Sequence, residues 1–300
     1  MLQKKIEQLI EPISGSFGIL IRHIQSGEEV KINSERLFQA ARCIKIPILI
    51  TLFRDIEEGK VQLDTRIRIK EEDRVTGSGI LRELDPGAEV SIKDLAMLMT
   101  IVSDNLATDK ILDIVGGVEN VDRYMKELGF ENIHVKQTLW DWLQESIGFT
   151  PQPYSQEYYE TVHQALFSGK SFDPESIVFT GSSHTNAMTP LDSTNLLEKM
   201  LKKELVSIKA SEAMLDMLSR QQLRRRIPYF LPPGTRVANK TGWIGNVVND
   251  VGIIELPEEK GQLIISVFIM DGSYYESESI IPYISKTAFE YFSEKPVKIY

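Results

Sequence analysis

A single lysine, Lys45, interrupts an apolar run at positions 44–50. A buried ammonium group is costly unless it is paired or loses its proton, so a lysine among isoleucines indicates a functional role. Pro47 is typical of the first turn of a helix, which we expect to run to about Glu58. Residues 42–45 then form a tightened entry turn in which the first and last side chains share a side. The alternative is an ordinary helix-start lysine with a buried stem.

This spacing is the one that a serine-lysine acyl-transfer site uses, with a hydroxyl three residues before a lysine that accepts its proton. Position 42 holds an arginine instead of a serine. A guanidinium stays protonated and has no electron pair with which to attack an acyl carbon. Cys43 is a poor substitute, because one step along a helical turn points it about 100° away. The sequence therefore predicts the lysine of such a site without its nucleophile.

Two tripeptides further along the chain complete a recognisable set. Ser103-Asp104-Asn105 follows an amphipathic stretch that we expect to be a helix, and Lys240-Thr241-Gly242 lies in a predicted strand. Each is common alone, but Ser-x-x-Lys, Ser-Asp-Asn and Lys-Thr-Gly in this order form one set. On this set the chain resembles class A β-lactamases and penicillin-binding serine hydrolases. Other segments that look like this family are 44–47, 77–81, 189–192, 226–228, 231–232, 240–243 and 249–252.

The resemblance implies roles for three residues near the helices. Lys45 matches the general-base lysine, and Ser103 matches the hydroxyl that passes a proton to the leaving nitrogen. Asn105 matches the side chain that holds the substrate amide and the lysine.

The strand residues also take roles from the resemblance. Lys240 and Thr241 match the pair that binds the substrate carboxylate. The strand after Gly242 implies one oxyanion-hole amide, and the second is the amide of the nucleophile position, Arg42.

A second departure concerns the carboxylate that activates water for deacylation. The family carries Glu-x-x-Leu-Asn before the Thr-Pro helix start, and this chain lacks it. The nearest look-alike, at 173–177, offers Asp173 and Glu175. The alternative for these two, and for Glu157 and Glu160, is a solvated carboxylate in a loop with no part in catalysis. A lone loop histidine such as His184 is more often structural or solvated than a base.

Two functions therefore compete. The family reaction is the hydrolysis of β-lactams through a serine acyl-enzyme, which we expect to be impaired because Arg42 occupies the serine position. The alternative is a non-catalytic pseudoenzyme that holds a carboxylate-bearing peptide or cell-wall-like ligand between Arg42, Lys240 and Thr241. The missing glutamate favours the second reading, and the otherwise intact motif set favours the first.

Composition narrows the class of protein further. The 300 residues are 42% hydrophobic and 26% charged, which is typical of a soluble globular protein and not of a disordered or membrane protein. The net charge of -9 argues against a nucleic-acid partner. One cysteine excludes an internal disulfide, and the four scattered histidines indicate no metal or cofactor. No export signal is visible, so we expect a cytoplasmic protein, or an extracellular one if a leader has been trimmed.

The order of predicted elements gives the fold. Two strands near the N-terminus, at 16–24 and 28–32, precede a long helical stretch, and three strands at 235–243, 247–256 and 262–270 precede a last helix at about 278–292. We expect one α/β (α+β) β-lactamase-like domain over residues 1–300. Its five-stranded antiparallel sheet comes from both chain ends (1–35 and 230–300), and its helical part covers 36–229, with mixed helix and loop at 134–187.

Overall fold

The centre of the fold is an antiparallel sheet of five strands in the order β2-β1-β10-β9-β8. The computed structural model describes residues 1–168 and 172–294. β1 pairs with β10 from Ser16 opposite Met270 to His23 opposite Leu263. The prediction of a single sheet built from both chain ends is therefore confirmed. The strands are β1 (Ser16–His23), β2 (Glu29–Ile32), β8 (Val237–Ile244), β9 (Val247–Glu255) and β10 (Gln262–Met270).

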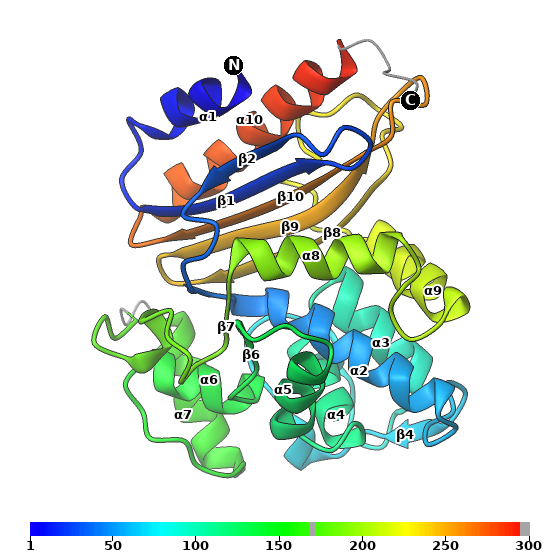
Figure 1. Cartoon of the computed structure of the whole chain (residues 1–300). Helices are drawn as coiled ribbons and strands as arrows, with labels where there is room; N and C mark the ends of the chain where they lie inside the picture. The colour runs from blue at the N-terminus through cyan, green and yellow to red at the C-terminus, as the bar shows by residue number, and fades with distance from the viewer. Residues whose placement is uncertain (169–171, 295–300) are drawn as a thin grey trace.

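Two terminal helices, α1 (Leu2–Ile10) and α10 (Tyr274–Ser293), cover one face of this sheet (Figure 1). Apolar residues of both helices and of all five strands form one buried cluster there. The last helix begins four residues earlier than the sequence pattern predicts. Its first turns therefore include Tyr274 and Glu278, which lie near the site described below.

The other face of the sheet packs against a layer of helices (Figure 1). α8 lies directly on β1, β9 and β10, and α2 is buried along most of its length. Polar caps begin four of these helices: Ser91 for α3, Asp104 for α4, Thr189 for α8 and Ser207 for α9. The layer comprises α2 (Lys45–Glu57), α3 (Ile92–Ile101), α4 (Asn105–Ile114), α5 (Val118–Glu127), α8 (Pro190–Leu201) and α9 (Ile208–Ser219).

Short strands fix the ends of the irregular region. β3 (Phe38–Gln39), β7 (Ala187–Met188) and β6 (Ile133–His134) form a three-stranded sheet, so the segment 135–186 leaves and returns at neighbouring strands. As predicted, that segment mixes helix and loop. It holds α6 (Leu139–Ser146), α7 (Gln156–Phe167) and the 3-10 turn η4 (Ile177–Phe179). The remaining elements are β4 (Arg66–Arg68), β5 (Glu89–Ser91), η1 (Ala41–Ile44), η2 (Glu71–Asp73) and η3 (Leu81–Glu83).

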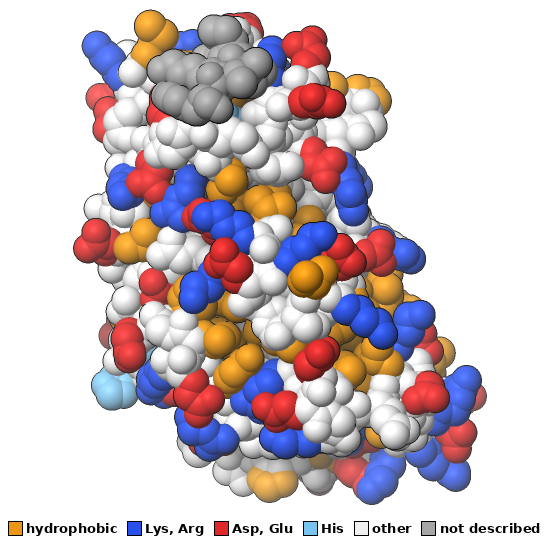
Figure 2. Space-filling view, turned by 45° about the vertical axis from the view of Figure 1, so that its right-hand side comes forward, with side chains coloured by type: hydrophobic (Ala, Val, Ile, Leu, Met, Phe, Trp, Pro, Cys, Tyr) orange, Lys and Arg blue, Asp and Glu red, His pale blue; other side chains and the backbone are white. Residues whose placement is uncertain are grey.

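Two features of the helices and of one face of the molecule bear on its surroundings. None of the helices in the described ranges is both long and apolar enough to cross a bilayer. On the face shown in Figure 2, basic and acidic side chains are interspersed. The net negative charge is therefore not gathered into one acidic region on that face.

Candidate functional site

The site begins where η1 meets the edge strand β8. Ala41 has a φ of 47°, a left-handed backbone conformation that is unusual for alanine. Gly242 on β8 passes so close that an added Cβ would lie 3.0 Å from the Ala40 carbonyl oxygen and 3.1 Å from the Arg42 backbone nitrogen. A side chain here would force these neighbours to shift, so glycine suits the close approach. It holds the start of α2 against the sheet edge.

Lys45, the first residue of α2, points its amine into a buried polar network. Its Nζ donates to the Ser103 carbonyl oxygen at 2.8 Å and to Asn105 Oδ1 at 3.1 Å. It also lies 3.1 Å from Ser103 Oγ. The residue is 1% exposed. The residue that the sequence singles out is therefore a buried lysine held by polar groups of the Ser-Asp-Asn segment, and not a snorkelling lysine.

Ser103 connects this lysine to a second one. Its Oγ lies 3.0 Å from Lys240 Nζ, so one hydroxyl bridges two amines. Lys240 also donates to the Thr241 carbonyl oxygen at 2.8 Å. Ser103 has a φ of 58°, and this left-handed conformation turns the chain between α3 and α4. Three motifs that are far apart in sequence thus meet in one hydrogen-bond network.

The middle residue of the Ser-Asp-Asn segment supports the network. Asp104 Oδ1 accepts from the Ala107 amide as the N-cap of α4. Its Oδ2 accepts from the amides of Ile80 and Leu81, at 2.6 and 2.9 Å. Gly79 lies against this carboxylate, where an added Cβ would come within 2.3 Å of it. Asp104 therefore fastens the 76–81 loop to the start of α4.

Asn105 and Ser78 fasten the same loop from its other end. Asn105 Nδ2 donates to the Thr76 carbonyl oxygen at 2.9 Å, and the Asn105 amide donates to the Ser78 carbonyl oxygen at 2.9 Å. Ser78 Oγ donates to the Ser103 carbonyl oxygen at 2.6 Å. The loop that resembles a family segment in sequence is thus a fixed wall of the site.

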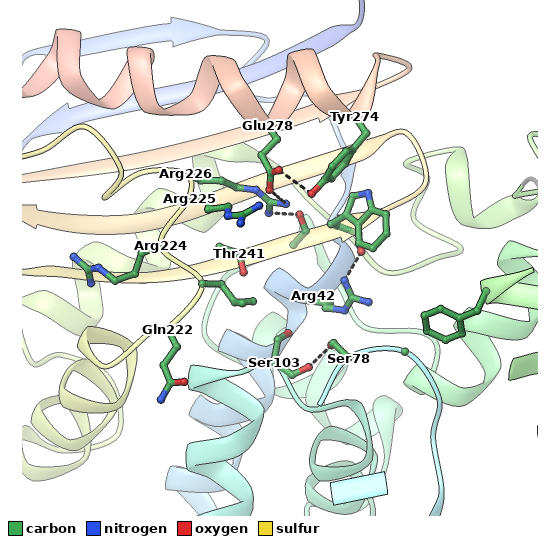
Figure 3. A pocket seen from close by; sticks show the side chains of 15 residues that line it. Arg42, Ser78, Ser103, Gln222, Arg224, Arg225, Arg226, Thr241, Tyr274 and Glu278 are labelled. Carbon is green, nitrogen blue, oxygen red and sulfur yellow. Dashed lines mark hydrogen bonds and ion pairs between the residues drawn. The ribbon is translucent and has the colours of Figure 1, made fainter. Parts of the chain in front are cut away.

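The Arg42 side chain extends from η1 to strand β8. Its Nη1 donates to the Trp243 carbonyl oxygen on β8 at 2.7 Å, and its guanidinium carbon lies 5.8 Å from the centre of the Trp243 ring. Its Nε is buried and has no hydrogen-bond partner in the described part of the chain. The side chain therefore bridges η1 and the sheet edge (Figure 3).

A cavity of about 460 Å³ opens above these groups. Ser103, Thr241 and Arg42 contribute to it, whereas Lys45 and Lys240 lie behind its wall. Figure 3 shows Arg42 on one side of the cavity and Gln222 with Arg224 on the other. The lining residues are Arg42, Gly77, Ser78, Ser103, Phe167, Gln222, Leu223, Arg224, Arg225, Arg226, Thr241, Gly242, Trp243, Tyr274 and Glu278.

The three consecutive arginines divide into two kinds. Arg226 is 5% exposed, donates to the carbonyl oxygens of Gly242 and Asn249 at 2.8 Å, and lies 3.3 Å from Glu278 Oε1. It anchors the segment before β8 to the sheet and to α10. Arg224 and Arg225 are exposed at the cavity and form no ion pair with another described residue.

Burial and mutual repulsion shape the protonation of these cations. Burial, together with repulsion from Arg42 and Arg226, lowers the pKa of Lys240 to about 7. Burial, with repulsion from Lys240 and Arg42, lowers the pKa of Lys45 well below its usual value. Burial beside Arg226 also lowers the pKa of Arg42 to about 10. The site therefore disfavours the protonated form of its two lysines, which release their protons more readily than a lysine in water.

Comparison with known proteins decides the family. The pattern of the β-lactamase enzyme family matches residues 1–292. The chain belongs to this family. It is 26% identical to β-lactamase VEB-1 of Pseudomonas aeruginosa, over 98% of this chain and 91% of that protein.

Two solved structures give the same result at the level of the fold. A β-lactamase from Sphaerobacter thermophilus is 27% identical, with a TM-score of 0.78 over 99% of this chain and 98% of that chain. A variant of PBP-A, solved as an acyl-enzyme complex with penicillin G, is 26% identical, with a TM-score of 0.76 over 98% and 97%. The resemblance inferred from three motifs therefore extends along the whole β-lactamase fold.

The carboxylates that the sequence offers for water activation lie away from the cavity of this β-lactamase-family protein. Asp173 packs at the end of α6, where its amide donates to the Ser146 carbonyl oxygen at 2.9 Å. Glu175 and His184 are exposed, and none of these three is among the described residues that line the cavity. Glu157 and Glu160 are exposed on α7.

A different carboxylate, Asp109, lies close enough to Lys45 for their charges to interact. It accepts from the amides of Leu139 and Trp140 at 2.7 and 2.9 Å, and so binds the first turn of α6 to α4. Burial raises its pKa to about 7, against the effect of those two amides and of Lys45. The sequence did not indicate this residue, because it reads as a solvated position between Thr108 and Lys110.

Cys43 is inert in this arrangement. It is fully buried, and its Sγ lies 3.4 Å from the Lys240 carbonyl oxygen. Burial raises the pKa of its thiol to about 12. A thiol with such a pKa is a poor nucleophile at neutral pH.

Several lining residues were not predicted from the sequence. Glu278 is the one carboxylate among the described lining residues, and Trp243, Tyr274 and Phe167 give the cavity an aromatic rim. No pattern in the sequence joins these positions, because they come from β8, α10 and α7. Among the residues that the structure describes, no three His, Cys, Asp or Glu side chains are placed to hold a metal ion.

Proposed function

We propose that this chain is a member of the β-lactamase family that binds a small carboxylate-bearing ligand, such as a β-lactam or a peptide-like molecule, and does not form an acyl-enzyme with it. The observation that carries the proposal is the side chain of Arg42. It replaces the hydroxyl that would stand three residues before Lys45, and it extends to the Trp243 carbonyl oxygen at the wall of the cavity.

The binding groups support the first half of the proposal. Ser103 and Thr241 line the cavity, and Lys240 lies behind them with its Nζ 3.0 Å from Ser103 Oγ. A carboxylate placed against the two hydroxyls meets polar hydrogens and a nearby positive charge. Charge-assisted hydrogen bonds of this kind are the strong ones in proteins.

The absence of acyl transfer follows from chemistry at one position. A guanidinium has no electron pair to form a bond with the acyl carbon, and the buried Cys43 thiol is almost entirely protonated at neutral pH because burial raises its pKa. Family-type covalent catalysis therefore lacks its nucleophile.

A second candidate function is β-lactam hydrolysis in a form of this chain that carries serine at position 42. The specific observation in its favour is the network around Lys45, which keeps its contacts to Ser103 and Asn105 without a serine present. If the lysine, the bridging hydroxyl and Lys240 are still arranged for acyl transfer, restoring one hydroxyl restores the first chemical step.

The test compares the natural chain with Arg42→Ser after incubation with penicillin G. We expect no mass gain for the natural chain and a gain of one ligand for Arg42→Ser, measured by mass spectrometry of the intact protein. The serine regains a lysine partner, and loss of the guanidinium removes one repulsive charge beside Lys45. Because the carboxylates nearest this network, Asp104 and Asp109, are held by backbone amides and are not among the described residues that line the cavity, we expect the adduct to persist for minutes or longer.

Arg42→Ala is the matched control, since it removes the same charge without adding a hydroxyl. Label on Arg42→Ala or on the natural chain contradicts the proposal, because it places the nucleophile elsewhere. A serine form that folds but takes up no label removes the hydrolase candidate.

A further inference from the structure

The guanidinium of Arg42 has donor groups that the protein does not use. Only Nη1 makes a hydrogen bond to a described residue, and its acceptor is the Trp243 carbonyl oxygen. Nε is buried without a partner, and Nη2 has no bond to any described residue. Because Nε is shielded from the cavity, Nη2 is the donor left for a ligand, and an oxyanion placed there receives a charge-assisted hydrogen bond.

These donors are separate from the carboxylate position assigned above. Arg42 comes from η1 and reaches the cavity beside Trp243 and Gly77, with its Nη2 3.9 Å from where a Cβ on Gly77 would lie. Thr241 and Ser103 approach the cavity from β8 and from the α3–α4 turn. Figure 3 shows Arg42 and Thr241 at the cavity on different elements, with Arg42 to one side of Thr241.

The charges around the cavity are not balanced by the protein. Its described lining holds four cations (Arg42, Arg224, Arg225 and Arg226) and one carboxylate, Glu278, which already pairs with Arg226. Tyr274 donates to the other oxygen of that carboxylate at 2.8 Å. One bound carboxylate therefore leaves a large excess of positive charge in the cavity.

We propose that the ligand of this cavity carries two anionic groups, one bound by Ser103, Thr241 and the charge of Lys240, and the other by Arg42. This inference rests on the proposed function, because it assumes that the first carboxylate binds at Thr241. It adds a chemical class: small dicarboxylates, or carboxylates with a phosphonate or sulfonate group. The planar guanidinium suits either, since it offers hydrogen bonds in the plane of an oxyanion.

The test is calorimetric titration with dicarboxylates of increasing length (malonate, succinate, glutarate, adipate and phthalate), each compared with its monomethyl ester at one ionic strength. We expect at least one dicarboxylate to bind about 10- to 100-fold more tightly than its monoester, which is the factor that one charge-assisted contact provides. Because the diacids differ in the separation of their two carboxylates, the series finds the distance between the two anionic positions by experiment.

Three variants assign the second group to Arg42. Arg42→Gln should reduce the preference for the dicarboxylate to less than about threefold while the monoester still binds, because only the second contact is lost. Arg42→Lys keeps the charge without the planar fork and should give an intermediate preference. Arg123→Gln removes an exposed cation of α5 that does not line this cavity, and should leave the preference unchanged.

The outcomes separate this inference from the proposed function. Equal affinity for every diacid and its monoester overturns the inference and leaves the carboxylate site standing. Loss of both affinities in Arg42→Gln, with the melting temperature retained, also overturns it, because Arg42 then serves the first group. If neither kind of ligand binds the natural chain at millimolar concentration, the proposed function itself fails.

Discussion

One hydroxyl between two buried amines is the feature that sets the chemistry of this protein at the residue scale. Ser103 Oγ lies within 3.1 Å of both Lys45 and Lys240, and Arg42 adds a third cation nearby. In a family member with a nucleophile, such repulsion favours a neutral lysine that accepts a proton. Here the same repulsion means that an anion bound in the cavity stabilises the protonated form of these groups.

Ligand binding should therefore depend on pH. Burial, with repulsion from Arg42, puts the pKa of Lys240 at about 7 in the free protein. A bound carboxylate favours the protonated amine and raises that pKa, so binding takes up a proton above about pH 7. We expect the affinity for a monocarboxylate such as monomethyl succinate to be highest below about pH 7 and to fall between about pH 7 and 9, measured by calorimetry in buffers of different ionisation enthalpy.

Arg42→Gln provides the comparison for this prediction. Removing that cation raises the pKa of Lys240, so the fall in affinity should begin at higher pH in the variant. A profile that is flat from about pH 6 to 9 in the natural chain would show that Lys240 does not change its protonation on binding.

The sequence revealed part of this site for a physical reason. Lys45 stands out because a lysine in an apolar run violates the usual pattern of burial, and the two tripeptides define elements that can meet it. Asp109 and Glu278 do not stand out. Each sits at an ordinary polar position of a helix, and only the packing of α6 on Asp109 and of Arg226 on Glu278 gives them partners.

At the scale of elements, Asp104 joins three pieces of the structure. It caps α4 and also accepts from two amides of the loop that forms one wall of the cavity. The sequence predicts a helix start here. It does not predict that one carboxylate also fixes a loop 23 to 24 residues earlier in the chain, because nothing local in the sequence indicates that contact.

Asp104→Ala should therefore cost more than the loss of a helix cap. A cap alone is worth about 1 kcal/mol, and each buried amide left without an acceptor adds about 1 to 3 kcal/mol. We expect a loss of at least about 3 kcal/mol in the free energy of unfolding, measured by urea denaturation, with weaker ligand binding because the 76–81 loop is released.

Thr138→Ala is the matched variant, because Thr138 caps α6 through the Asp141 amide and lines no part of the cavity. It should cost about 1 kcal/mol and leave binding unchanged. Equal losses in the two variants would mean that the contacts of Asp104 to Ile80 and Leu81 contribute little.

On the scale of the whole molecule, the strands were predictable and the cavity was not. Alternating apolar runs at both chain ends place β1, β2 and β8 to β10, and a helical middle requires one sheet to cover it. The aromatic and arginine lining comes instead from β8, α7, α10 and the segment before β8. These lining residues come together because of how α10 and the segment 135–186 pack. No periodic pattern in the local sequence indicates that packing.

Buried ionisable groups should also give the whole fold an unusual response to pH. The pKa of Asp109 is about 7 in the folded protein because of burial, and the carboxyl has its ordinary value of 3.8 when unfolded. Between about pH 4 and pH 7 the native state therefore holds a proton that the unfolded state has lost, and Asp109 lowers stability as pH rises through this window. Lys240 acts in the opposite sense. The cost of burying its charge is greatest below about pH 7 and fades as pH rises from there to its unfolded value of 10.5, so Lys240 raises stability over that window.

Asp109→Asn isolates the first of these effects. The amide oxygen can still accept from the Leu139 and Trp140 backbone amides, but the side chain no longer ionises. The difference in unfolding free energy between Asp109→Asn and the natural chain should therefore grow in favour of the variant from about pH 4 to about pH 7 and stay constant above it, as measured by urea denaturation at closely spaced pH values. Asp113→Asn, an exposed change on the same helix, is the matched control for the general effect of replacing a carboxylate by an amide. A constant difference for Asp109→Asn would mean that Asp109 titrates at its ordinary value, and that Lys45 lies close enough to stabilise the carboxylate as an ion.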